Sequence, residues 1–355
     1  MSSVSGSRDP VKFMESRKGK VNLYLEKYFD EIYSEVKDRE MSKIVDLLRT
    51  YTVRGGKRVR PILVAAGYQF FGGKSDDIYG AAISIEISQS FFLIHDDIMD
   101  RSDLRRGFRS FHREIEELIG NVRDREHIAE SLAIVGGDLA VDYSFDAILR
   151  SGIDDERKLK AVRELVDIIK ITGYGEGLDV YSGTGYRLTT SDLIRLHLRK
   201  TAKYTIEGPL IMGARIAGND DPLWDLKAYG SLVGIAFQLH DDVIGLFGTE
   251  KEIGKPPKSD VNEGKQTLLM IEAMKRSDPA DRDFIWKTLT SGNVSDNDFE
   301  KLKRIVEDTG SLDYSRWLIN RFIELGKEKL SRVDGDPEVK DFLRWFADYL
   351  VSRKN

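Results

Sequence analysis

Residues 91–100 read FFLIHDDIMD, and residues 237–246 read FQLHDDVIGL, so one pattern occurs twice in this chain of 355 residues. Each stretch is an apolar segment that runs into a His-Asp-Asp triplet. Apolar segments of this kind, followed by turn-forming residues, are typical of helices that pack into a core. The chain therefore places pairs of acidic side chains on two helices that we expect to be buried.

The sequence around these segments is also helical in character. The chain has eight prolines, and none of them lies between residues 62 and 208. Proline breaks helices, and no sustained alternation of period two indicates a sheet in this interval. Apolar residues recur there at helical spacing, as in Val162, Leu165, Ile168 and Ile169. We predict an all-α fold, with one large helical-bundle domain over residues 1–355 and a flexible N-terminus over residues 1–20.

The composition excludes several classes of protein. With 41% hydrophobic and 32% charged residues, the chain is neither a membrane-spanning nor a disordered protein. It has no cysteine, which rules out disulfides, thiolate metal sites and a cysteine nucleophile. A net charge of −5 does not favour nucleic acid as a partner. The first residues lack the apolar core of a signal peptide, so we expect a cytoplasmic protein without membrane insertion.

The first acidic cluster carries two electrostatic penalties. Asp96 and Asp100 lie one turn apart on the same helix face, so their charges repel. The turn that follows places them near a helix C-terminus, where the helix dipole disfavours carboxylates. A bound dication would offset both penalties. Mg²⁺ is a typical candidate, because it is usually bound by few protein carboxylates together with the phosphate groups of a substrate.

A single DDxxD pattern is more often an exposed acidic helix end that neighbouring basic residues neutralise. Two such clusters, with Asp241 and Asp242 in the second, favour a metal site instead. We expect His95 and His240, which precede the acidic pairs, to have hydrogen-bonding structural roles, because the carboxylates suit this metal better.

Basic residues lie where a phosphorylated substrate would need them. The loop GGKRVRP at 55–61 supplies Lys57, Arg58 and Arg60 after two glycines, although it lacks the residues of a P-loop. Arginine binds phosphate oxygens well, and each basic residue alone would be an ordinary surface group. Further candidates are Arg105, Arg106, Lys200, Lys255 and Lys265. Their occurrence together with two acidic clusters predicts a polyanionic substrate.

The order and spacing of these motifs resemble the trans-isoprenyl diphosphate synthases, the short-chain prenyltransferases that include farnesyl and geranylgeranyl diphosphate synthases. The motifs are GGKRVRP at 55–61, HDDIMDRSDLRRG at 95–107, GEGLD at 175–179, KT at 200–201, FQLHDDVIG at 237–245 and GK…SD…EGK at 254–265. The resemblance implies an isoprenoid synthase fold, in which two Asp-rich motifs face each other across a central cavity. It also implies a homodimer.

The resemblance assigns a role to each matching position. It implies three Mg²⁺ ions held on the allylic diphosphate by Asp96, Asp100 and Asp241, and the metal-binding set that it implies also includes Asp97 and Asp242. The residues that would contact the allylic diphosphate are Arg105, Lys200, Lys255 and Lys265. Those that would bind isopentenyl diphosphate are Lys57, Arg60, Gln89 and Arg106. Thr201 and Gln238 would lie beside the reacting carbons, and the tail SRKN at 352–355 is loosely similar to a closing basic tail.

The implied reaction is a head-to-tail (1′-4) condensation. Mg²⁺ and the cationic side chains would stabilise the departing pyrophosphate, so that the allylic C–O bond ionises. The double bond of isopentenyl diphosphate would then attack the carbocation, and a proton would be lost. The allylic partners would be dimethylallyl, geranyl and, for the longer product, farnesyl diphosphate.

Two positions depart from the family pattern. Gly245 stands where the second acidic motif usually has its final Asp, and Glu176 stands where a Gln is common. We expect activity to survive the first change. The sequence does not predict the consequence of the second, which adds a negative charge near Asp179.

The product length depends on the residues one turn before the first motif. Phe91 and Phe92 occupy the fifth and fourth positions before Asp96. Two adjacent aromatics resemble farnesyl synthases and favour a C15 product, whereas an aromatic at the fifth position alone resembles archaeal-type geranylgeranyl synthases. A C20 or mixed C15/C20 product is the close alternative, and both rings could also be ordinary core residues.

Two other classes of protein share parts of this pattern. A terpene cyclase would have a helical fold and one acidic motif, but it would not need GGKRVRP and RRG together with a second motif. A non-catalytic helical subunit would be expected to lose acidic ligands, whereas this chain has kept all five.

Overall fold

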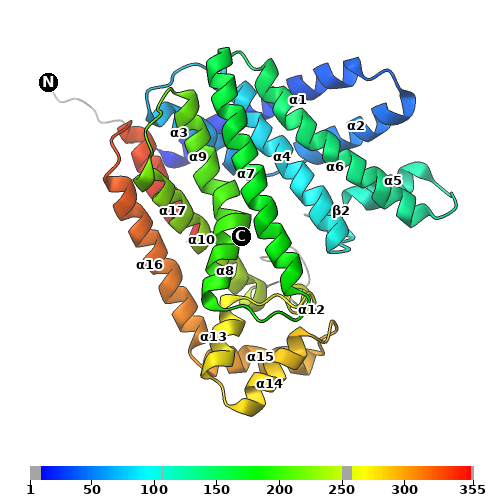
Figure 1. Cartoon of the computed structure of the whole chain (residues 1–355), viewed down its shortest axis with the longest axis vertical. Coiled ribbons are helices and arrows are strands. Elements are labelled where there is room, and N and C mark those ends of the chain that lie inside the picture. The colour runs from blue at the N-terminus through cyan, green and yellow to red at the C-terminus, as the bar shows by residue number, and fades with distance from the viewer. Residues whose placement is uncertain (1–8, 106, 250–257, 353–355) are drawn as a thin grey trace. The chain divides into compact units, whose positions relative to one another are not determined.

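The computed structural model describes residues 9–105, 107–249 and 258–352. The regular structure in these ranges is helical apart from a hairpin of two antiparallel strands, in which Leu104 pairs with Arg109 and Arg105 with Phe108 (Figure 1). The all-α prediction is confirmed. Residues 10–20, which we expected to be flexible, form the first part of a helix that Asp9 caps by accepting from the backbone N–H of Val11.

The chain packs as two compact units, and the predicted single domain stays a prediction. The first unit comprises residues 1–166, 209–222 and 335–342, and the second comprises 167–208, 223–334 and 343–355. Helix α7 (Asp155–Ser182), helix α9 (Gly208–Ile216) and helix α17 (Pro337–Val351) each contribute residues to both units. The other elements of the first unit are α1 (Pro10–Glu35), α2 (Arg39–Val53), α3 (Val59–Phe70), α4 (Ile78–Met99), β1 (Leu104–Arg105), β2 (Phe108–Arg109), α5 (Phe111–Ile119) and α6 (Arg125–Arg150). Those of the second are α8 (Thr190–His197), η1 (Leu198–Glu207), α10 (Trp224–Phe247), α12 (Ser259–Asn262), α13 (Leu268–Arg276), α14 (Pro279–Leu289), α15 (Asp296–Asp308) and α16 (Ser311–Ser331).

Helix α4 is the central helix of the first unit. Its residues from Ile78 to Ser90 are buried almost without interruption, as expected for a helix that is apolar on all sides. It packs along α6 and also contacts α3 (Figure 1). This burial fixes the end of α4, where the first acidic motif lies.

Two glycines let α3 and α9 approach each other within the first unit. A Cβ atom on Gly67 would meet the backbone of Leu210, and one on Gly213 would meet the backbone of Val64. Because backbone atoms cannot rotate away as side chains do, both positions require glycine.

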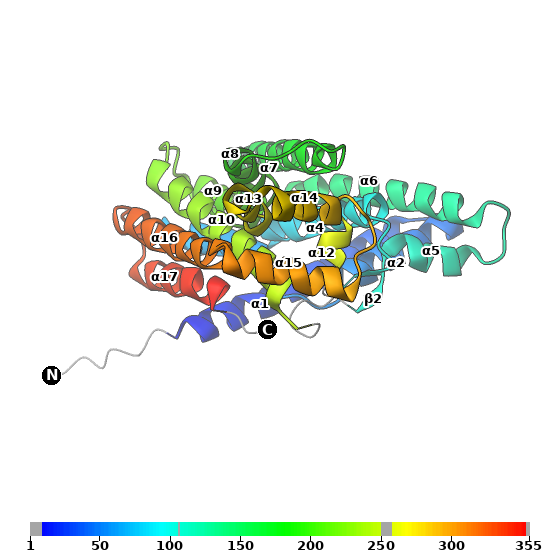
Figure 2. The same cartoon turned by 90° about the horizontal axis from the view of Figure 1, so that it is seen from below.

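Helix α10 is the corresponding buried helix of the second unit. It packs against α16 (Figure 2). It also packs against η1, a segment of π-helix. Tyr229 on α10 is fully buried, and its hydroxyl donates to the Leu343 carbonyl at 2.7 Å. A Cβ on Gly234 would meet Ala202, so this glycine allows the close approach of η1. The second acidic motif follows at the end of α10.

Among residues 9–105, 107–249 and 258–352, no helix has both the length and the apolar character that a membrane crossing requires.

We expect Gly67→Ala to lower the free energy of unfolding by about 2 kcal/mol, because its methyl group would press on the Leu210 backbone. Gly19→Ala is the matched control in α1, where an added Cβ meets nothing within 4 Å. That control should raise the free energy of unfolding by about 0.5–1 kcal/mol through helix propensity. Urea unfolding followed by circular dichroism measures both, and shifts of the same sign would contradict backbone-to-backbone packing of α3 and α9.

Candidate active site

The first acidic motif lies at the C-terminus of α4, as its sequence predicts. Asp100 caps the helix, and its backbone N–H donates to the Asp96 carbonyl at 2.8 Å. Asp97 has no exposed surface, Asp96 is partly buried, and Asp100 is exposed. The helix end thus presents carboxylates at three depths, from the core to the surface.

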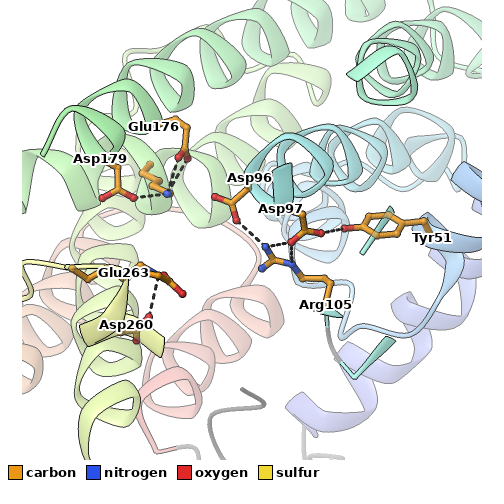
Figure 3. Close-up of polar contacts among 10 residues, drawn as sticks. Tyr51, Asp96, Asp97, Arg105, Glu176, Asp179, Asp260 and Glu263 are labelled. Carbon is orange, nitrogen blue, oxygen red and sulfur yellow. Dashed lines mark hydrogen bonds and ion pairs between the residues drawn. The ribbon is translucent and has the colours of Figure 1, made fainter. Parts of the chain in front are cut away.

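Arg105 neutralises two of these carboxylates. The chain turns back directly after α4, where the Ser102 N–H donates to the Asp97 carbonyl at 2.8 Å. Arg105 of β1 then donates from Nε to Asp97 Oδ1 at 2.7 Å and from Nη2 to Asp96 Oδ2 at 2.9 Å (Figure 3). The Tyr51 hydroxyl, from α2, donates to the second oxygen of Asp97 at 3.1 Å. Both oxygens of Asp97 are therefore occupied, and Asp97 shares the guanidinium of Arg105 with Asp96.

Burial and neighbouring charges shift the pKa values of Asp97 and Arg105 in opposite directions. Burial raises the pKa of Asp97 above its ordinary value, although Arg105 partly opposes the shift. Burial also disfavours the charge on Arg105, but Asp97 and Asp96 outweigh it and raise the pKa of the guanidinium. The cluster thus keeps its arginine charged.

A small pocket lies beside Arg105 in the first unit. It is lined by Tyr51, Thr52, Arg54, Glu86, Gln89, Ser90, Leu93 and Arg105. The structure therefore brings together Gln89 and Arg105, two residues that the sequence analysis placed at different diphosphates. Gln89 is buried, so its amide reaches the pocket from within the core.

The loop before α3 is held by a buried arginine. Arg58 has a left-handed backbone conformation and is 3% exposed, and it pairs with Glu86 of α4 at 2.6 Å. It also donates to Asn22 and to the carbonyls of Thr52 and Val53. Its grouping with the phosphate-binding cations is therefore wrong, because its guanidinium is used inside the core. Lys57 is exposed, which leaves it accessible to a ligand.

In the second unit, Lys200 is paired with two carboxylates of α7. Its Nζ lies 3.0 Å from Glu176 and 2.5 Å from Asp179 (Figure 3). A Cβ on Gly175 would meet the backbone of Lys200, so this glycine allows the contact between α7 and η1. The GEGLD segment thus supplies both the close approach and the acidic partners of Lys200.

The next residue of η1 contacts the helix of the second acidic motif. The Thr201 hydroxyl donates to Gln238 Oε1 at 2.8 Å, and Gln238 Nε2 donates to Asp242 Oδ1 at 3.1 Å. Asp241, beside it, is exposed. The structure therefore joins Thr201 and Gln238, which the sequence analysis assigned to the same place.

Lys265 lies between two further carboxylates. Its Nζ is 3.0 Å from Asp260 and 2.7 Å from Glu263 (Figure 3). Burial lowers the pKa of this lysine, but Asp260 and Glu263 outweigh burial and raise it overall. A Cβ on Gly245 would meet the Asp260 carboxylate, so a side chain at the departing position of the second motif would displace Asp260.

Comparison with known proteins identifies the family. The sequence profile of the family described as polyprenyl synthetase matches residues 42–307. This chain belongs to the polyprenyl synthetase family.

Its relatives are isoprenyl diphosphate synthases of several product lengths. The chain is 32% identical to the geranylgeranyl diphosphate synthase of Methanosarcina mazei over 301 residues, which covers 84% of this chain and 86% of the relative. It is also 32% identical to the geranylfarnesyl diphosphate synthase of Natronomonas pharaonis, with the same coverage. The crystal structure of a geranylgeranyl pyrophosphate synthase from Corynebacterium glutamicum, complexed with isoprenyl diphosphate and magnesium, has a TM-score of 0.89 and 31% identity. That comparison covers 98% of this chain and 100% of the other. The protein is a short-chain trans-prenyltransferase.

Some predicted site residues of this polyprenyl synthetase lie outside the described ranges. They are Arg106, Lys255 and the tail residues 353–355. The facing of the two acidic motifs across a cavity stays a prediction, because the motifs belong to different units. Among the residues that the structure describes, no group of three or more acidic or histidine side chains converges on one point as a metal cage would.

Sequence reasoning missed the partners of the charged residues. Tyr51 and Glu86 are isolated polar residues in segments with no motif signal of their own, and Asp260 lies in the GK…SD…EGK motif, where the sequence analysis gave it no role. The His95 prediction agrees with the geometry, since His95 Nε2 lies 3.2 Å from the Ile134 carbonyl oxygen. Only the packing of α2, α6 and α12 places such groups beside the motifs.

Proposed function

We propose that this polyprenyl synthetase condenses isopentenyl diphosphate with an allylic diphosphate in a Mg²⁺-dependent, head-to-tail (1′-4) reaction. The observation that carries the proposal is the end of α4, where Asp96, Asp97 and Arg105 combine carboxylates for a cation with a guanidinium for a phosphate. The motif order across the chain and the names of the relatives support it. We propose C15 as the product, with C20 or a C15/C20 mixture as the alternative.

The carboxylates fit Mg²⁺ by their chemistry. Asp96 is partly exposed, and Asp100 and Asp241 are exposed, so we propose these three as ligands. Asp97 has no exposed surface, and the side chain of Asp242 is 13% exposed against 20% for Asp96, so we give Asp97 and Asp242 supporting roles. Mg²⁺ typically takes one or two protein carboxylates together with substrate phosphate, which these residues can supply. When bound, Mg²⁺ neutralises diphosphate charge and so favours ionisation of the allylic C–O bond.

The basic residues of the chain then bind and orient the two substrates. Arg105, Lys200 and Lys265 are each paired with carboxylates, and a diphosphate would compete for the same hydrogens. We propose that these three and Lys255 hold the allylic diphosphate. The proposed isopentenyl diphosphate site comprises Lys57, Arg60, Gln89 and Arg106.

The next part of the proposal concerns the side-chain oxygens of Thr201 on η1 and Gln238 on α10. Thr201 donates its hydroxyl hydrogen to Gln238, so the lone pairs of Thr201 stay available to a developing positive charge. The allylic C–O electrons leave with pyrophosphate, and the double bond of isopentenyl diphosphate forms the new C–C bond. A proton then passes to the released pyrophosphate, and the product is five carbons longer.

The chain-length proposal rests on two aromatic rings of α4. Phe91 and Phe92 are partly buried, with ring centroids 4.7 Å apart. Phe91 also contacts His95, with centroids 4.9 Å apart, so the two rings are held one turn before the acidic motif. Bulk at this place limits how far a growing prenyl chain extends.

The homodimer is also part of the proposal. Helix α6 exposes apolar side chains that its own unit does not cover, namely Ile128, Ile134, Val135 and Leu149. Such residues are typical of a surface that a second copy covers. Light scattering of the purified protein tests it, because a monomeric mass would exclude this interface.

The direct test of the function is an elongation assay. Purified protein is incubated with Mg²⁺, labelled isopentenyl diphosphate and, separately, C5, C10 and C15 allylic diphosphates, and the dephosphorylated alcohols are separated by chromatography. We expect elongation that stops at C15 and that EDTA abolishes, because the carboxylates then lack their cation. Efficient extension of the C15 starter would establish the C20 alternative. No elongation with any starter would refute the function, and cyclised hydrocarbons would point to a terpene cyclase.

We expect Phe92→Ala to lengthen the product, since it removes a ring from the proposed floor of the pocket. The same chromatography measures the shift from C15 to longer alcohols. Phe71→Ala is the control, because Phe71 is also partly buried but follows α3, away from the acidic motif. An unchanged product distribution in Phe92→Ala would refute this account of chain length.

We expect Glu176→Gln to bind inorganic pyrophosphate about fivefold more tightly in the presence of Mg²⁺, because Lys200 then has one anionic competitor fewer. Isothermal titration calorimetry measures the dissociation constant. Asp167→Asn makes the same charge change on α7, in an exposed pair with Lys170, and should leave the affinity unchanged. Equal affinities of Glu176→Gln and the parent protein would show that Glu176 does not compete for Lys200.

A further inference from the structure

His197 is a buried residue that belongs to none of the motifs. It is the last residue of α8, directly before η1, and it is 4% exposed. Neither of its ring nitrogens makes a hydrogen bond to another described residue. Its Nε2 lies 3.2 Å from Asp242 Oδ2, within ion-pair distance. Because buried polar atoms without partners are unfavourable, this position calls for a physical reason.

Asp242 connects His197 to the proposed catalytic oxygens. Its other oxygen, Oδ1, accepts from Gln238 Nε2 at 3.1 Å, and Gln238 Oε1 accepts from the Thr201 hydroxyl at 2.8 Å. The hydrogen bond from Gln238 Nε2 to Asp242 Oδ1 places the amide nitrogen of Gln238 on the side of Asp242. The amide oxygen then faces Thr201, and the direction of the Thr201 hydroxyl follows from it.

The four residues come from two helical segments in matching register. His197 and Thr201 are four residues apart where α8 runs into η1, and Gln238 and Asp242 are four residues apart on α10. Residues at this spacing lie on one helix face. Gly234 of α10 lets η1 approach, and π-helical segments such as η1 occur often at functional sites. The two pairs therefore form one contiguous set.

We propose that His197 is a positioning residue for the prenyl transfer. It holds Asp242 so that Gln238 and Thr201 keep the orientation that leaves the Thr201 lone pairs for the allylic cation. Asp242 thereby serves as an anchor within its unit, and Asp241 is the metal-binding carboxylate of this motif. The inference rests on the proposed function, because it assumes that Thr201 and Gln238 lie beside the reacting carbons.

The test compares His197→Leu with His197→Gln. Leucine removes the ring nitrogen that lies 3.2 Å from Asp242 Oδ2, whereas the amide of glutamine can place a nitrogen near Asp242 from a similar position. We expect His197→Leu to lower kcat about tenfold, with both KM values and the pyrophosphate dissociation constant within about twofold of the parent protein. His197→Gln should recover most of kcat. His127→Leu, an exposed histidine of α6, is the control.

A double-mutant cycle distinguishes positioning from a general effect on folding. Asp242→Asn combined with His197→Leu should lower kcat no further than the more damaging single change, because both act through one carboxylate. Additive losses would refute the proposal. A melting temperature that falls in His197→Leu while kcat is unchanged would show a purely structural role and also refute it.

A measurement that needs no turnover separates this inference from the proposed function. The side-chain amide NMR resonance of Gln238 reports its hydrogen bond to Asp242. It should shift in His197→Leu and return toward the parent position in His197→Gln. If the parent protein forms no prenyl product, the proposed function fails, and an unshifted resonance refutes the positioning of Asp242 independently.

Discussion

Carboxylates at the ends of buried helices must be neutralised, and this constraint organises both units of the protein. At the end of α4, Asp97 is fully buried, and the ion pair with Arg105 compensates for the loss of its hydration. Arg105 lies on β1, the first strand after this helix end, and donates to Asp97 from there. The packing of α4 in the core and the chemistry at its end are therefore consequences of the same burial.

The charged groups divide into fixed pairs and exchangeable pairs. The side chains of Arg58 and Glu86 are 2% and 5% exposed and hold the loop before α3, so no ligand can replace either partner without opening the core. Lys200 with Glu176 and Asp179, and Lys265 with Asp260 and Glu263, are partly exposed instead. When a diphosphate binds together with its cation, the lysine can pair with the diphosphate and the carboxylate with the cation. The free-energy change of this exchange is small, because each group gains a new counterion.

The two departures from the family pattern have local physical explanations. Glu176 adds a second carboxylate to Lys200, which makes the lysine more strongly paired in the free protein. Gly245 lies against the carboxylate of Asp260, so the missing side chain leaves room for the partner of Lys265. Each change therefore alters the contacts of a cationic residue. The sequence still has Asp96, Asp100 and Asp241, the three proposed metal ligands.

The amino-acid sequence by itself determined the helical class, the acidic helix ends and the residues that belong together in motifs. These properties are local, because they depend on apolar periodicity, on proline positions and on charges a few residues apart. The tertiary structure decided the partners. Tyr51 reaches Asp97, Arg58 is buried against Glu86, and His197 lies beside Asp242 only because separate helices pack together. A side chain far along the chain leaves no periodic signal at the residue it contacts, so sequence reasoning grouped Arg58 with the phosphate ligands and passed over His197.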